Sequence, residues 1–194
     1  MAATASPPPR IPHQRWYERE LGWVPQEVGG PGSPRRLPTG AAFDALDVPA
    51  DAGRAVLGRL APAATGPALL DGDRVLLLIA AGCAEEVPAL LDWLEWRGVD
   101  LGLRALGPGG SVAAPGSGGS AVWLRPPEPG GVALPAWPAG PGIGGGEPAA
   151  GSGCRARPDL VRLLSVAATE CHRLRLHGAR TRTARTADQP FAFS

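Results

Sequence analysis

The chain has 194 residues, of which 19 are Arg or Lys and 18 are Asp or Glu, so its formal net charge is +1. This balance gives no overall case for binding nucleic acid or an acidic membrane, and the longest apolar run, Val75 to Ala81, is far too short to span a bilayer. Gly (28) and Pro (23) exceed a quarter of the chain, but they concentrate before residue 41 and between residues 126 and 158. The foldable part is therefore shorter than the chain.

All 19 basic residues are Arg, which with the excess of Ala, Gly and Pro is typical of a GC-rich genome such as an actinobacterial one. Three cysteines, Cys83, Cys154 and Cys171, are odd in number and widely separated, so they form neither a zinc motif nor a disulfide framework. The first residues lack the apolar run of a signal peptide. We therefore expect a cytoplasmic protein.

The first 40 residues contain one short predicted element. His13–Leu21 reads as a short helix that ends at Gly22. The segment Gln26–Gly40 is rich in Gly, Pro and Arg, and we expect a loop or flexible arm there.

The next segments predict a strand, a helix and a hairpin. Phe43–Val48 is a strand, and a helix follows over Ala50–Leu60, with Asp51 able to cap it. Two apolar runs then flank an Asp-Gly-Asp turn, which is a strong hairpin signal. The second run is continuously apolar over Val75–Ile79, which indicates a central strand covered on both faces.

The second half of the domain adds a helix and three strands. Gly82–Trp96 has acidic residues in its first turn and an apolar stripe, so we expect a helix that stops at Gly98. Val99–Leu103 alternates as a strand with one wet face, and Ser111–Pro115 and Ser120–Pro126 read as two more. This order predicts an α+β fold with a mixed, mainly antiparallel sheet and two or three packed helices.

The predicted domain organisation has five parts. Residues 1–12 are a disordered N-terminus, 13–127 the α/β domain, 128–157 a Gly/Pro-rich linker, 158–177 an amphipathic helix and 178–194 a basic disordered tail. The amphipathic helix must bury its apolar stripe. Its own domain, a protein partner and a second copy through residues 158–176 are the open choices.

Three carboxylates are the candidate catalytic groups: Asp44, Asp47 and Asp100. A metal-dependent nucleotidyl transferase needs two or three carboxylates that converge on divalent cations. Asp44 and Asp47 are three residues apart, so they point to opposite faces of a regular strand and cannot hold one metal without a bulge.

The order of several segments resembles a known family. The matching pieces are WYERELGWVP, FDALDVP, RVLLLIAAG, GVDLGLRALGPGGSVAAPGS and AVWLRPP. They resemble the N-terminal primase/polymerase domain of bifunctional DNA primase/polymerases, within the archaeo-eukaryotic primase superfamily. The resemblance runs over roughly residues 14–127.

The resemblance implies a damaged active site. Asp47 matches the first acid of the family's first motif, but Pro49 stands where the second should be. The strand that should carry a phosphate-contacting His, Asp73–Leu77, has none, whereas Asp100 matches the acid of the third motif. The implied metal ligands are Asp47 and Asp100, with Mg²⁺ or Mn²⁺ as cofactor if the protein is active, and Asp44 is a vestigial acid.

The leading hypothesis is a degenerate primase/polymerase-like protein in DNA replication that binds single-stranded nucleic acid, a nucleotide or a protein partner without nucleotidyl transfer. Arg35, Arg36, Arg104 and Arg125, with Trp123, would line a strand-binding groove. Scattered surface Arg from genome bias is the competing interpretation. The alternatives are a divergent active primase/polymerase and a structural interaction module that works through the C-terminal helix; no membrane is expected to take part.

Overall fold

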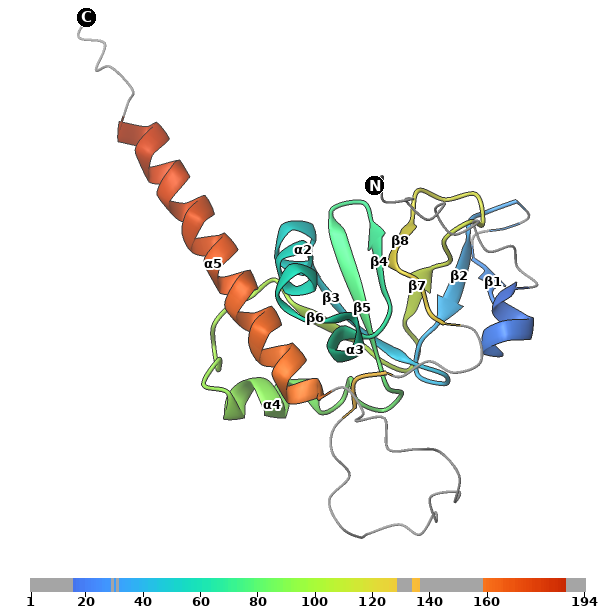
Figure 1. Cartoon of the computed structure of the whole chain (residues 1–194). Helices are drawn as coiled ribbons and strands as arrows, with labels where there is room; N and C mark the ends of the chain where they lie inside the picture. The colour runs from blue at the N-terminus through green and yellow to red at the C-terminus, as the bar shows by residue number, and fades with distance from the viewer. Residues whose placement is uncertain (1–15, 29, 31, 129–133, 137–158, 188–194) are drawn as a thin grey trace, which may run out of the picture.

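The computed structural model describes residues 16–28, 30, 32–128, 134–136 and 159–187, with the side chains of the last helix described as far as Gly178. Two antiparallel sheets and a group of helices form an α+β fold, so the predicted fold class is confirmed (Figure 1). The expected disordered N-terminus lies outside the described residues, as does most of the expected linker.

The larger sheet has five strands in the order β6-β3-β5-β4-β8, and all neighbouring pairs are antiparallel. Its strands are β3 (Asp44–Pro49), β4 (Ala68–Asp71), β5 (Arg74–Ile79), β6 (Arg104–Leu106) and β8 (Val122–Arg125). β5 lies in the centre and Val75–Ile79 are all buried, as the continuous apolar run predicts. The predicted hairpin is confirmed in β4 and β5, which join through a turn where Gly72 has φ of +60°.

The smaller sheet has the order β1-β2-β7 and was not predicted in full. Its strands are β1 (Gln26–Glu27), β2 (Arg35–Pro38) and β7 (Ser111–Ala113). The expectation of a loop over Gln26–Gly40 is wrong, because β2 pairs with β7 from the far end of the domain, a partner that the local pattern does not reveal. The described part of the predicted helix His13–Leu21 is confirmed as η1 (Tyr17–Leu21), a π-helix that ends at Gly22 in the left-handed conformation.

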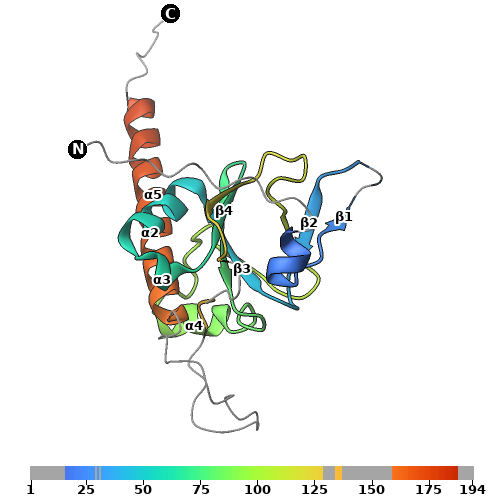
Figure 2. The same cartoon turned by 45° about the vertical axis from the view of Figure 1, so that its right-hand side comes forward.

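Different elements cover the two faces of the larger sheet, because successive side chains of a strand point to opposite sides. The helices α2 (Ala50–Arg59), α3 (Pro62–Thr65), α4 (Val87–Trp93) and α5 (Leu160–Ala187) lie on one side, and the smaller sheet and η1 lie on the other (Figure 2). Leu46 and Leu77 belong to the core under the helices, whereas Ala45 and Leu76 belong to the core between the sheets.

Helix α5 buries its apolar stripe on its own domain, which answers the question that the sequence left open. The fully buried residues of the stripe are Leu160, Leu163, Leu164, Ala167, Ala168 and Cys171. They join the core that includes α2, α4 and the larger sheet. Glu170 lies beside the stripe and pairs with Arg59 of α2 and with Arg173, each at 2.9 Å.

Three local expectations are corrected. Val99–Leu103 is not a strand, because Gly102 has φ of +63°, and the strand on this side of β3 is Arg104–Leu106 instead. The helix expected from Gly82 begins only at Val87, after a series of turns. The disordered tail expected from residue 178 starts as helix, since α5 continues to Ala187 through Arg and Ala residues that favour a helix once it is nucleated.

Two glycines of α2 test how closely this helix approaches the sheet. A Cβ at Gly53 would lie 2.4 Å from the Cβ of Val75, whereas a Cβ at Gly58 would meet nothing within 4 Å. We predict that Gly53→Ala lowers the free energy of unfolding by about 1–3 kcal/mol through overpacking. Gly58→Ala should raise it by about 0.5–1 kcal/mol, because Ala has the higher helix propensity. Urea denaturation of both variants measures this; equal effects of the same sign would contradict the packing described.

Candidate functional site

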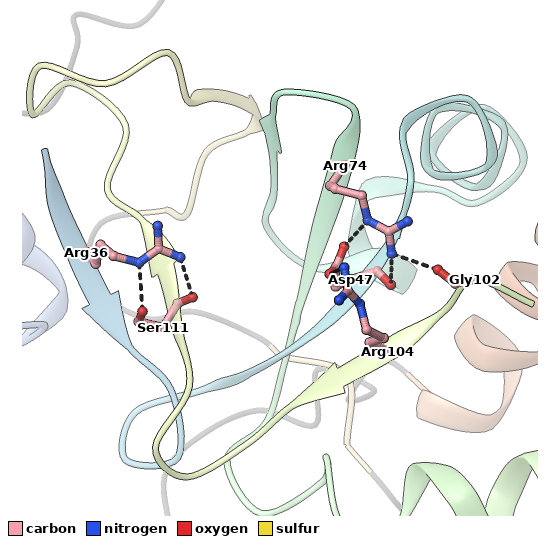
Figure 3. Close-up of polar contacts among 6 residues, drawn as sticks. All are labelled: Arg36, Asp47, Arg74, Gly102, Arg104 and Ser111. Atoms are coloured by element: carbon pink, nitrogen blue, oxygen red, sulfur yellow. Dashed lines mark hydrogen bonds and ion pairs between the residues drawn. The ribbon is translucent and has the colours of Figure 1, made fainter. Parts of the chain in front are cut away.

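Asp47 is the centre of a charged cluster on the face of the larger sheet that looks toward the smaller sheet. The Nε of Arg74 lies 2.5 Å from Asp47 Oδ1, and Nη2 of Arg104 lies 3.2 Å from Asp47 Oδ2 (Figure 3). Register explains the arrangement, because Arg104 on β6 is directly opposite Asp47 on β3, and Arg74 begins the neighbouring strand β5. We refer to Asp47, Arg74 and Arg104 as the Asp47 cluster.

The two arginines of the Asp47 cluster differ in exposure and in the number of hydrogen bonds that they make. Arg74 also donates to the carbonyl oxygens of Asp47, at 3.0 Å, and Gly102, at 2.7 Å, and its side chain is 23% exposed. The side chain of Arg104 is 69% exposed. Two guanidiniums against one carboxylate leave the cluster with a formal charge of +1. Arg74 is therefore built into the fold, and Arg104 is the group that solvent and solutes reach.

Asp44 lies on the other face of β3, as its spacing from Asp47 predicts. It is fully buried, and its Oδ2 accepts a hydrogen bond of 2.9 Å from the backbone nitrogen of Ala84. Its Oδ1 has no hydrogen-bond partner among the described residues. The strand has no bulge that could turn Asp44 and Asp47 to one side, since its pairing with β5 is continuous.

Asp100 lies in the turn before β6, where it is exposed. Its Oδ1 accepts a hydrogen bond of 3.1 Å from the nitrogen of Gly102, and its Oδ2 lies 2.5 Å from Nη1 of Arg175 on α5. The hydrogen bond from Arg175, followed by that from Gly102, lowers the pKa of the Asp100 carboxyl. The acid thus serves the turn and the contact with α5.

The donor set does not fit a divalent cation. Within the described ranges, no group of three or more His, Cys, Asp or Glu side chains could hold a metal ion. Both carboxylate oxygens of Asp47 already face guanidiniums, Asp44 points to the opposite face, and Asp100 is paired with Arg175. Cationic neighbours oppose the approach of Mg²⁺ or Mn²⁺ and favour that of an anion.

Trp123 and Arg125 of β8 lie on opposite faces. Trp123 belongs to the core between the sheets, where its Nε1 donates to the Tyr17 hydroxyl at 3.1 Å. Arg125 points under the helices and donates to the carbonyl oxygens of Leu57 and Leu60 and to the hydroxyl of Thr65. Burial lowers the pKa of the Arg125 guanidinium. The larger sheet therefore presents Arg104 and Trp123 on one face, at its opposite edges, and Arg125 on the other.

Arg35 and Arg36 lie on the smaller sheet. Arg35 pairs with Glu27 at 2.9 Å. Arg36 makes two hydrogen bonds to Ser111 of β7, from Nε to Oγ at 2.7 Å and from Nη2 to the carbonyl oxygen at 2.8 Å (Figure 3). Both guanidiniums thus join strands within this sheet.

Sequence reasoning missed Arg74. The resemblance points to a histidine within Asp73–Leu77, whereas the residue of this segment that enters the cluster is Arg74. One signal was available, since a charged residue at the start of a buried central strand requires an opposite charge nearby. Which acid supplies that charge depends on strand register, and the sequence does not give it.

No family model, curated protein or solved structure matches this chain. The geometry of the Asp47 cluster, and not a relative, therefore supports what is proposed below. Among the described residues, no helix combines the length and the apolarity that crossing a membrane requires.

Tyr17 provides a test of the contact with Trp123, because it is the only tyrosine of the chain. Burial raises the pKa of its phenol from 10.0 to about 12, partly offset by the hydrogen bond from Trp123. A near-ultraviolet absorbance titration should find half-ionisation near pH 12 in the folded protein and near 10.0 in denaturant. Trp123→Phe should raise the folded pKa further, since it removes the donor.

The same shift makes stability depend on pH. Below pH 10.0 the folded and unfolded chains both carry the neutral phenol, so its contribution is fully present. As the pH rises from 10.0 toward 12, the unfolded chain ionises first and this contribution is lost. A folded-state midpoint at the ordinary value would contradict the burial of Tyr17.

Proposed function

We propose that this chain is a primase/polymerase-like protein of the cytoplasm that binds single-stranded nucleic acid or nucleotide and does not transfer nucleotides. The observation that carries the proposal is the Asp47 cluster. The acid that the resemblance assigns to metal binding is held by two guanidiniums, and the cluster keeps an excess positive charge.

The chemistry of the Asp47 cluster favours phosphate over metal. Nucleotidyl transfer relies on carboxylates that hold cations against the attacking and leaving oxygens, and no such set surrounds Asp47 among the described residues. A guanidinium binds phosphate oxygens through parallel hydrogen bonds. An exposed ion pair contributes about 0–1 kcal/mol, so Arg104 can leave Asp47 for a phosphate at small cost.

The remaining residues of the expected nucleic-acid groove contribute unequally to the proposal. Trp123 shares a face with Arg104 and is half-buried, so stacking of a base on its ring remains a prediction. Arg125 donates to three groups at the ends of α2 and α3, so we assign it to the fold and not to the groove.

Arg104→Gln tests the proposal with little risk to folding, because the side chain is mostly exposed. We predict weaker binding of a fluorescently labelled single-stranded oligonucleotide by anisotropy. The slope of log affinity against log salt should fall by about 0.7, the value for one lost phosphate contact.

Arg97→Gln is the matched control, since Arg97 is also an exposed arginine paired with an aspartate, Asp92, but it follows α4 on the helical side. Equal effects of the two substitutions would indicate non-specific charge and would count against the Asp47 cluster.

An assay for primer synthesis tests the non-catalytic part of the proposal. We expect no nucleotide incorporation on a single-stranded template with Mg²⁺ or Mn²⁺. Incorporation that disappears in Asp100→Asn would establish the divergent enzyme instead, and this variant is suitable because Asp100 is exposed.

A further inference from the structure

A chain of contacts leads from the Asp47 cluster to α5. Arg74 binds Asp47 and also the carbonyl oxygen of Gly102, at 2.7 Å. Arg175 of α5 binds Asp100 in the same turn, through the carboxylate at 2.5 Å and through the carbonyl oxygen. The turn from Asp100 to Gly102 is therefore held from one side by the sheet and from the other by α5.

Beyond this contact α5 leaves the core. Its fully buried stripe ends at Cys171, and Leu176 is 52% exposed. Figure 1 shows the second half of the helix extending past α2 and away from the sheets. We call Arg173–Ala187 the α5 arm.

The composition of the α5 arm is strongly one-sided. It contains five arginines and no aspartate or glutamate, so its formal charge is +5 in a chain whose net charge is +1. The arginines are Arg173, Arg175, Arg180, Arg182 and Arg185. Arg173 and Arg175 are partly neutralised by Glu170 and Asp100, and both belong to the docked end of the arm.

The composition of the arm distinguishes between possible binding partners. Leu174 and Leu176 are its only large apolar residues, which is too little for the apolar face that an interfacial membrane helix or a coiled coil requires. A strongly positive segment without an apolar face is complementary to the phosphate backbone of a nucleic acid. The arm also begins at the turn that adjoins the Asp47 cluster, so one nucleic-acid strand can reach both the arm and the cluster.

We propose that the α5 arm is a second nucleic-acid-binding element. It binds the phosphate backbone of a single-stranded nucleic acid that runs from Arg104 over the Asp100–Gly102 turn. This proposal rests on the function proposed above and extends it. From Arg175 to Ala187 the helix is about 18 Å long at 1.5 Å per residue, so the arm lengthens the bound segment by several nucleotides. It reads charge and not sequence, because the backbone carries no base information.

The test is the full-length triple variant Arg180→Gln, Arg182→Gln and Arg185→Gln. Glutamine has a helix propensity close to that of arginine, so the helix should be kept, as circular dichroism can check. For a labelled oligonucleotide of about 30 nucleotides, the slope of log affinity against log salt should fall by about 2. Between 50 and 200 mM salt, the factor by which the affinity decreases should then be about twentyfold smaller than for the unmodified protein. Binding of a strand of about ten nucleotides should change less.

The matched control removes the same charge elsewhere, with Arg19→Gln, Arg97→Gln and Arg162→Gln, all exposed positions outside the arm. This control should bind like the unmodified protein. If the unmodified protein binds, Arg104→Gln weakens binding and the arm variant does not, the arm proposal is overturned and the proposed function stands.

Other outcomes would overturn both proposals or assign the arm a different binding partner. Failure of the unmodified protein to bind any oligonucleotide at low salt would overturn both proposals. An arm variant that loses binding only to vesicles of phosphatidylcholine and phosphatidylserine would make the arm a membrane element. A change in the oligomeric state of the arm variant in solution would make the arm an interface between copies of the chain. Either result would exclude nucleic acid as the partner of the arm.

Discussion

Packing of α5 against α2, α4 and the larger sheet is the interaction on which the rest of the fold depends. The helical face of β3 and β5 carries Leu46, Val48, Leu77 and Ile79, all buried. The stripe of α5 joins the same core, and each buried leucine contributes about 1.5–3 kcal/mol relative to exposure. α2 lies between α5 and β5, close enough that only glycine fits at residue 53. Without α5, the apolar residues of α2, α4 and the sheet that its stripe covers would face water.

The sequence was informative where the apolar pattern is local. Asp71–Asp73 between two apolar runs identified the β4–β5 hairpin, and the stripe from Leu160 to Cys171 identified α5. The pattern failed for β2, and it marked β7 as a strand without revealing its partner, because three-residue pairings between distant segments leave no periodic signal. It also failed at Val99–Leu103, where alternation suggested a strand but glycine and strand register placed the pairing further along, at Arg104–Leu106.

The candidate site was predictable in part for the same reason. The spacing of Asp44 and Asp47 was enough to predict opposite faces, since strand periodicity is a local property. The pairing of Asp47 with Arg74 and Arg104 was not predictable, because it joins three strands whose register only the fold determines. The hydrogen bonds of Arg125 were likewise not predictable, since its partners at the ends of α2 and α3 lie 60 or more positions earlier in the chain.

The distance along the chain between α5 and its partners bears on how the protein is synthesised. β3, α2 and β5 are complete by Ile79, but α5, which completes the core on this side, starts at Leu160. Chains emerge from the ribosome at about 5–20 residues per second, so the surface that α5 covers stays open for several seconds. During that interval the nascent chain exposes an apolar surface, and we expect chaperones to bind there until α5 arrives.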